Sequence, residues 1–512
     1  MVPAHRPETF YQAIQTYWFT HLAVTTELNP WDAYSPGHFD QHLGPFYERD
    51  VQAGILTRDQ AQELMECLWV KFYNQPAPPK VGITLQDVCL ISERPSLHAA
   101  GASALPGVLQ ALAGVHQFLD NRLRVVEGGL SPAFPGNLAG PLQEFPGIFP
   151  ADLHIGVGLD QLEVIHAVQD DVRHLKVFEL TLFNGVDQIT GKQLGPKTGE
   201  AKDFKTFDQL WDAYTRQIEH FLSVKIQGSN LIEALYAKYM PVPFLSILTN
   251  DCIAQGRDYN AGGARYNTSV IQGVGTGTIS DCLAAVKYNV YDHQNFTMEE
   301  LLAALRENFQ GHDRILNLVR NKTPKYGNDD DYADGLMRKV FNYFVDSVSG
   351  RPNMRGGTYR VDMLPTTCHV YFGDVMIASP NGRLAHKPVS EGISPEKGAD
   401  VNGPTAVIKS CAKMDHLKTG GTLLNQKFTP AVVAGEEGLD RMADLVRSYF
   451  DMDGHHIQFN VVDRDTLRAA QKNPEEYRDL IVRVAGYSDY FRNLDKALQD
   501  EIIERTEQGF GV

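Results

Sequence analysis

Three groups of residues have types that could hold an ion or a phosphate. His455 and His456 carry metal-ligating imidazoles, but neighbouring side chains on a strand point to opposite faces, so the pair does not readily share one metal. Residues 329–331 are three aspartates, which suggest a cation site but are more typical of a solvated loop. Residues 262–265 contain two glycines and an arginine, yet lack the lysine and spacing of a P-loop. We expect no metal site.

The C-terminal residues 481–508 hold a more specific pattern, Arg-Val-Ala-Gly-Tyr around Gly486. A lone Gly-Tyr pair would most simply mark a turn that needs an unusual backbone angle. Here the pattern continues, and the whole run resembles the signature of glycyl radical enzymes, with further matches at Phe491, Leu494, Gln499, Glu501, Ile502 and Ile503. The resemblance makes Gly486 the predicted radical site.

Radical chemistry has a physical reason to require glycine. A radical on Cα is stabilised jointly by the electron-donating amide nitrogen and the electron-withdrawing carbonyl, and it prefers a planar centre. A Cβ would crowd that planar form, and only glycine lacks one. Because oxygen destroys the radical, we expect Gly486 in a loop that is buried at rest and lies between packed elements, outside helices and strands.

The resemblance covers residues 2–84 and 176–512, which are similar to the pyruvate formate-lyase-like glycyl radical enzymes. Stretches that carry it include NKTPKYGNDDDYAD, GGTYRVDMLPTTCHVYFG, GGTLLNQKFTP and DGHHIQFNVVD. It implies an α/β fold, a partial ten-stranded barrel surrounded by helices, with the N-terminal part missing. The domains expected from it are a lyase-like fragment at 1–85, an aberrant segment at 86–175, the lyase-like domain continued at 176–384, and a glycine radical domain at 391–512.

In that family the glycyl radical oxidises a cysteine of a Gly-Cys-Val-Glu motif. The resulting thiyl radical takes a hydrogen atom from the substrate, and the glutamate acts as a base. The resemblance implies no bound cofactor, a radical S-adenosylmethionine activating enzyme as partner, a small-molecule substrate and a homodimer. Within the family, the sequence is most similar to the branch that dehydrates trans-4-hydroxy-L-proline. Glycerol or propanediol dehydratase, choline trimethylamine-lyase, formate C-acetyltransferase and a non-catalytic remnant that binds the activating enzyme stay open.

The same resemblance places Asp32, Leu364 and Thr366 at substrate-pocket positions. Asp32 could hold the cationic ring nitrogen of a proline-like substrate through a charge-assisted hydrogen bond. It could equally be an Asx-turn residue. Thr366 could be a hydroxyl at the end of a strand.

The chain has no Gly-Cys-Val-Glu motif, so we expect it to be inactive as written. None of its six cysteines is followed two positions later by Glu: Cys67, Cys89, Cys252, Cys282, Cys368 and Cys411. The motif should lie within residues 86–175. When the codons for residues 92–101 are reverse-complemented, they can encode a peptide that begins Ser-Gly-Cys-Val-Glu. The same operation on residues 166–175 also gives a sequence that resembles the family. We favour an inverted reading over a diverged insert, and we expect poor packing there.

The elements that would position these residues alternate between helices and strands, as in α/β proteins. Apolar residues recur at helical spacing through residues 9–72, where Thr57 and Gln60 can form a capping box. Thr206 and Thr297 each precede another helical stretch. Short apolar runs predict strands at 243–248, 369–378 and 456–462.

Composition limits the partners and the compartment. The 512 residues carry a formal charge of −16, which repels a phosphate backbone, so we expect no nucleic-acid partner. No apolar run reaches the roughly 18 residues of a spanning helix, and the first residues show no secretory signal. Six irregularly spaced cysteines suggest a reducing compartment. We therefore expect a cytoplasmic enzyme with no membrane partner.

Overall fold

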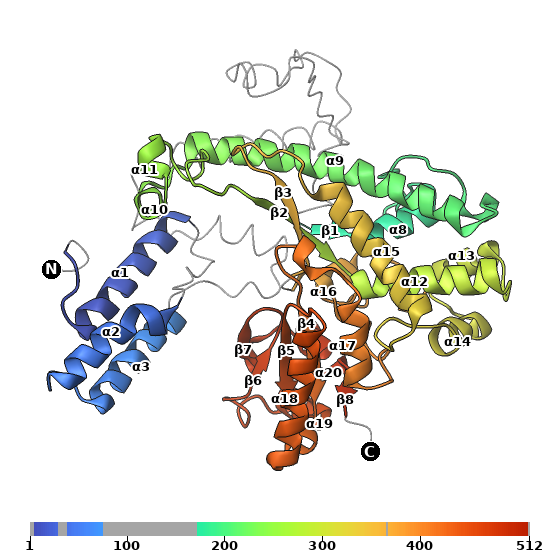
Figure 1. Ribbon diagram of the computed structural model, residues 1–512. Helices are drawn as coiled ribbons and strands as arrows, with labels where there is room; N and C mark the ends of the chain where they lie inside the picture. The colour runs from blue at the N-terminus through green and yellow to red at the C-terminus, as the bar shows by residue number, and fades with distance from the viewer. Residues whose placement is uncertain (1–4, 29–37, 75–170, 365–366, 510–512) are drawn as a thin grey trace. The chain divides into compact units, whose positions relative to one another are not determined.

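The computed structural model describes residues 5–28, 38–74, 171–364 and 367–509 (Figure 1). The chain divides into two compact units, Met1–Leu130 with Ile232–Asn267, and Ser131–Leu231 with Thr268–Val512. Within the described ranges, no helix is both long and apolar enough to cross a membrane.

The first unit is helical. Its elements are α1 (Phe10–Leu28), α2 (Phe39–Gln52), α3 (Arg58–Asn74), the end of α9 (Phe207–Tyr239), α10 (Pro243–Leu248) and α11 (Cys252–Gln255). The helices α1 to α3 share a small apolar core that includes Phe10, Ile14 and Leu68. The predicted capping box is confirmed, because the Gln60 N–H donates to Thr57 Oγ1 (3.2 Å) and the Thr57 N–H donates to Gln60 Oε1 (2.9 Å).

The second unit begins with a parallel sheet in the order β1-β2-β3, made of Asp171–Arg173, Ser269–Val274 and Tyr359–Asp362. The helices nearby in sequence are α8 (His174–Leu182), α9, α12 (Thr276–Val286), α13 (Met298–Arg306), α14 (Asp313–Asn321) and α15 (Asp331–Val348). Two threonines begin helices as predicted: Thr206 Oγ1 accepts the Gln209 N–H (3.3 Å), and Thr297 makes a full capping box with Glu300. The large apolar core of this unit includes the α9 face.

Residues 171–175, the end of the segment expected to pack poorly, belong to regular elements. Residues 171–173 form β1 and pair with β2. His174 and Leu175 are buried at the start of α8. At this end the segment therefore supplies an edge strand and two buried residues, and for the rest of the segment poor packing stays a prediction. Residues 86–170 lie outside the described residues.

A second parallel sheet has the order β5-β4-β8, made of Ile457–Val461, Leu424–Phe428 and Glu507–Gln508. A separate hairpin pairs β6 (Ile481–Arg483) with β7 (Ser488–Tyr490). Helices α16 (Cys368–Asp374), α17 (Pro404–Ala412), α18 (Gly435–Asp451), α19 (Arg464–Lys472) and α20 (Lys496–Glu504) belong to this part (Figure 1). One parallel bridge, Met363 with Thr422, links the end of β3 to the approach to β4.

Two of the three predicted strands are wrong. Residues 243–248 form α10, which has Pro243 in its first turn, where proline favours a helix start. Residues 368–374 form α16, with His369, Phe372 and Gly373 buried at helical spacing. Short apolar runs cannot be assigned to strand or helix by periodicity alone. The third prediction is confirmed, because residues 457–461 form β5.

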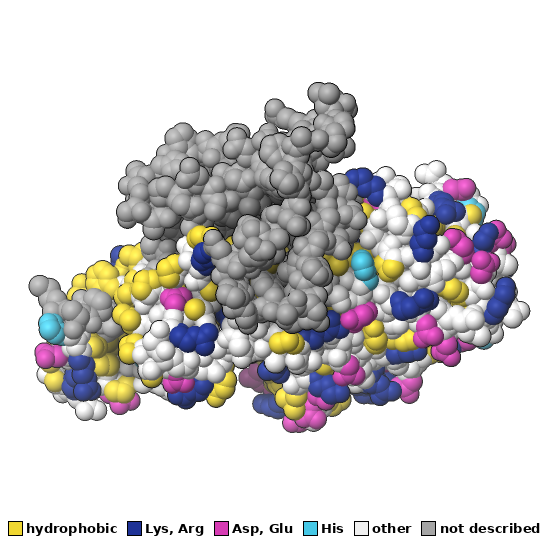
Figure 2. Space-filling view, turned by 90° about the horizontal axis from the view of Figure 1, so that it is seen from above, with side chains coloured by type: hydrophobic (Ala, Val, Ile, Leu, Met, Phe, Trp, Pro, Cys, Tyr) yellow, Lys and Arg dark blue, Asp and Glu magenta, His cyan; other side chains and the backbone are white. Residues whose placement is uncertain are grey.

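Charged side chains of both signs are interspersed on the face seen in Figure 2. Among the described residues, exposed ion pairs connect adjacent turns within a helix, such as Arg441 with Glu437 in α18 and Lys496 with Asp500 in α20. Each such pair contributes little stability, because water screens it.

Candidate active site

Gly486 lies in the bend between β6 and β7, outside any helix or strand, as predicted. Its φ of +84° is in the left-handed region that favours glycine. A Cβ added there would lie 3.2 Å from Leu364 Cδ1. Val484 and Ala485 are fully buried, but Gly486 is exposed. The prediction of a buried loop is therefore confirmed for Val484 and Ala485 and is wrong for Gly486 itself.

Of the three predicted substrate residues, only Leu364 is described, and its half-buried side chain is the nearest group that a Cβ on Gly486 would meet. Asp32 and Thr366 lie outside the described residues. Leu364 lies two positions after the end of β3, so that the end of this strand and the bend of the hairpin are close together.

Cys368 is the cysteine nearest in sequence to Leu364. It begins α16, is half-buried, and its Sγ accepts a hydrogen bond from the Tyr371 hydroxyl (3.0 Å). Two other thiols are fully buried, and burial raises the pKa of Cys282 to about 12 and the pKa of Cys411 still further. These two thiols therefore stay protonated. Cys89 lies outside the described residues.

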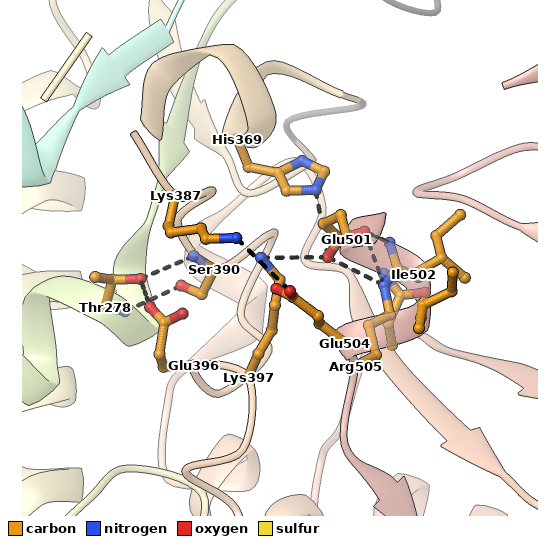
Figure 3. A network of polar contacts seen from close by, with 12 residues as sticks. Thr278, His369, Lys387, Ser390, Glu396, Lys397, Glu501, Ile502, Glu504 and Arg505 are labelled. Atoms are coloured by element: carbon orange, nitrogen blue, oxygen red, sulfur yellow. Dashed lines mark hydrogen bonds and ion pairs between the residues drawn. The ribbon is translucent and has the colours of Figure 1, made fainter. Parts of the chain in front are cut away.

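A buried charge cluster lies between α16, α20 and the loop that contains Lys397 (Figure 3). Glu501, which is 1% exposed, accepts from Arg505 Nη2 (2.9 Å). Lys397 Nζ and His369 Nε2 each lie 3.6 Å from Glu501 Oε1. Burial would raise the pKa of Glu501, but Arg505, Lys397 and His369 together hold it well below its usual value. Burial also lowers the pKa of His369, which favours its neutral form.

Beside this cluster is a polar cavity of about 30 Å³, lined by Glu391, Asp400, Lys427 and other polar residues. Burial raises the pKa of Glu391 and the pKa of Asp400 to about 7 each. Glu391 Oε2 and Gln426 Oε1 are buried and have no hydrogen-bond partner. The cavity has room for a water molecule, which buried polar atoms of this kind normally bind.

The aspartates at 329–331 have structural roles. The Asp330 side chain accepts the Tyr332 N–H at the start of α15. Asp329 and Asp331 form ion pairs with Lys413, as does the buried Asp334. Within the described ranges, no three His, Cys, Asp or Glu side chains are grouped to hold a metal ion.

Sequence reasoning missed the polar partners of these residues. The sequence indicates Glu501 only as one position of the radical signature, and it assigns no role to Gln458. Gln458 Oε1 accepts the Gly486 N–H (3.3 Å) across 28 positions of sequence. The available signal was the alternation of Gln458 and Asn460 with apolar residues in β5.

Two family descriptions match the chain. Pyruvate formate lyase-like matches residues 1–88 and 171–373, and Glycine radical matches residues 389–492. Trans-4-hydroxy-L-proline dehydratase from Clostridioides difficile is 54% identical over 100% of this chain and 69% of its own length. (2S)-3-sulfopropanediol dehydratase from Klebsiella oxytoca is 32% identical over 98% of this chain and 66% of its own length.

Solved structures agree with these relatives. The crystal structure of hydroxyproline dehydratase from Clostridioides difficile, with trans-4-hydroxy-L-proline bound, has a TM-score of 0.80 and 50% identity, and covers 100% of this chain and 69% of that one. The glycerol-bound B12-independent glycerol dehydratase from Clostridium butyricum has a TM-score of 0.77 and 33% identity, over 98% and 68%. The chain thus spans about two thirds of these proteins. On this sequence and structural evidence, the chain belongs to the pyruvate formate lyase-like glycyl radical enzymes.

Proposed function

We propose that the chain is the radical-bearing part of a glycyl radical dehydratase, with Gly486 as the radical residue. The observation that carries the proposal is the Gly486 bend, a positive-φ glycine held against Leu364 inside the segment that matches Glycine radical. A radical S-adenosylmethionine activating enzyme would remove a hydrogen atom from the Gly486 Cα. The parallel strands β1 to β5, linked by the Met363–Thr422 bridge, would be part of a ten-stranded barrel.

The substrate class we propose is a small hydroxylated metabolite, first of all trans-4-hydroxy-L-proline. The 54% identical relative supports this choice over (2S)-3-sulfopropanediol dehydratase, which is 32% identical. Leu364 would then contribute an apolar wall beside the radical carbon, and Asp32 would hold the ring nitrogen.

We further propose that the chain as written does not dehydrate this substrate. The sequence lacks Gly-Cys-Val-Glu, so the relay from glycine to thiol has no matched cysteine and base. The inverted reading would lie within residues 86–175, and it would account for the gap from 89 to 170 in the matched family ranges. A second candidate function follows from the same absence: a non-catalytic chain that binds the activating enzyme and carries only the radical.

The test has two parts. Sequencing the coding DNA across codons 80–180 should show an inverted block, and a continuous sense reading there would argue for a true insert. An anaerobic assay should then compare the activated chain with a version that has the block restored and the remaining family segments supplied. We expect dehydration of trans-4-hydroxy-L-proline only in the restored version. Turnover by the chain as written would refute the proposed inactivity, and Cys368 would be the first thiol to test.

A further inference from the structure

The hairpin of Gly486 is attached to the core sheet by side chains. Among the described strands, β6 pairs with β7 alone and has no backbone ladder to β5. The side-chain amide of Asn460 on β5 instead pairs with the backbone of β6, as a neighbouring strand would. Its Oδ1 accepts the Arg483 N–H (2.7 Å), and its Nδ2 donates to the Arg483 carbonyl (2.7 Å). The first strand of the hairpin is therefore held at Arg483 by the Asn460 carboxamide, and Arg505 Nη1 also donates to the Arg483 carbonyl (3.3 Å).

Two more carboxamides hold the bend itself. Gln458, two positions from Asn460 and so on the same side of β5, accepts the Gly486 N–H (3.3 Å) and Arg483 Nε (2.7 Å) through one oxygen. Its Nε2 donates to Asn425 Oδ1 on β4. Asn425 Nδ2 in turn donates to the Val484 carbonyl (3.5 Å). The peptide groups on the N-terminal side of the glycine are thus fixed from both β4 and β5.

All three carboxamide residues are buried, with exposed fractions of 5% to 8%. Buried amides are costly unless both their donors and their acceptors are satisfied, so a set arranged in this way defines one geometry. The position of Gln458 requires both an acceptor and a donor, because its oxygen accepts from the Arg483 guanidinium and its nitrogen donates to an amide oxygen.

We propose that Asn425, Gln458 and Asn460 form an amide clamp in which Gln458 is a positioning residue for the radical at Gly486. This inference rests on the proposed function. The clamp fixes the plane of the Ala485–Gly486 peptide, and with it the direction of the Gly486 Cα–H bonds. An acceptor on the Gly486 N–H also increases electron density on the amide nitrogen, the donor half of the pair that stabilises the radical.

The first experiment uses the full, unactivated chain. Gln458→Met keeps the length of the side chain but removes its hydrogen bonds, and Gln458→Glu keeps an acceptor but loses the donor to Asn425. The control is Gln471→Met, since Gln471 donates to Asp500 elsewhere in the same region. We expect hydrogen exchange in peptides covering residues 481–490 to accelerate roughly tenfold in Gln458→Met and to be unchanged in the control.

The second experiment reads the radical. After anaerobic activation, the electron paramagnetic resonance splitting from the remaining Gly486 α-hydrogen should change in Gln458→Met and stay at the parent value in Gln471→Met. A merely structural role would lower stability without altering the splitting. If Gln458→Met does not fold, Gln458→Glu gives both readouts.

The outcomes separate the two proposals. Unchanged exchange at residues 481–490 in a folded Gln458 variant overturns the clamp, whatever the activity. An unchanged splitting with faster exchange overturns the positioning role. A parent that gives no radical refutes the proposed function, while the exchange measurement still decides the clamp.

Discussion

Replacing Glu501 with Gln should destabilise the second unit strongly. Gln keeps the shape but removes the charge that pairs with Arg505, Lys397 and His369. Arg505 and Lys397 would then be left as positive charges in a site where Glu501 is 1% exposed. Breaking a buried ion pair by removing one partner costs about 3–5 kcal/mol. That loss is a large part of the stability of an ordinary domain.

The neighbouring Asp500 offers a matched control on the same helix. Asp500 pairs with the exposed Lys496 (3.0 Å) and accepts from Gln471 (2.8 Å). Asp500→Asn should therefore cost about 1 kcal/mol or less. Urea unfolding followed by fluorescence and circular dichroism gives both free energies. If Glu501→Gln loses no more than Asp500→Asn, the cluster does not hold α20 in place and the reasoning is wrong.

Three further predictions concern stability. Because burial raises the pKa of Glu391 and of Asp400 to about 7, both bind protons more tightly when folded. Their contribution to the unfolding free energy should fall as pH rises from about 4 to 7, by at most about 3–4 kcal/mol each. When urea unfolding is measured at several pH values between 4 and 8, the unfolding free energy of Asp400→Asn should fall less steeply with pH than that of the parent chain. An equal dependence on pH in the two proteins would contradict this prediction. Gly486→Ala should lower the free energy of unfolding by about 1–2 kcal/mol, because alanine is strained at this positive φ while the end of the Leu364 side chain can move away. An unchanged melting temperature would contradict this prediction. Thr297→Ala should cost about 1 kcal/mol in the same assay by removing a capping box, and no loss would show that the cap is dispensable.

Local sequence signals predicted much of the helical structure. Capping pairs such as Thr297 with Glu300 act over three residues, so that spacing alone reveals them. Strands were harder, because residues 243–248 and 369–378 are apolar runs too short to show a period. The first run is helical throughout, with Pro243 in its first turn, and the second is helical up to Asp374.

In the candidate site too, residues in a contiguous motif could be predicted from the sequence, whereas contacts between distant segments could not. The Gly486 bend could be found, because its signature is contiguous and glycine is the only residue without a Cβ. Gln458 and the distant partners of Glu501, Lys397 and His369, could not, because these contacts join segments 25 to 132 positions apart or depend on which face of β5 meets the hairpin. A single sequence does not reveal such pairings.

The most direct test of the account is the radical itself. The chain, produced with α-deuterated glycine and activated anaerobically by a radical S-adenosylmethionine activating enzyme, is examined by electron paramagnetic resonance beside unlabelled protein. We predict a doublet from one α-hydrogen in the unlabelled chain, its collapse in the deuterated chain, and no signal in folded Gly486→Ala. A signal that survives in Gly486→Ala, or no signal in the folded parent, would contradict the assignment of Gly486 as the radical residue.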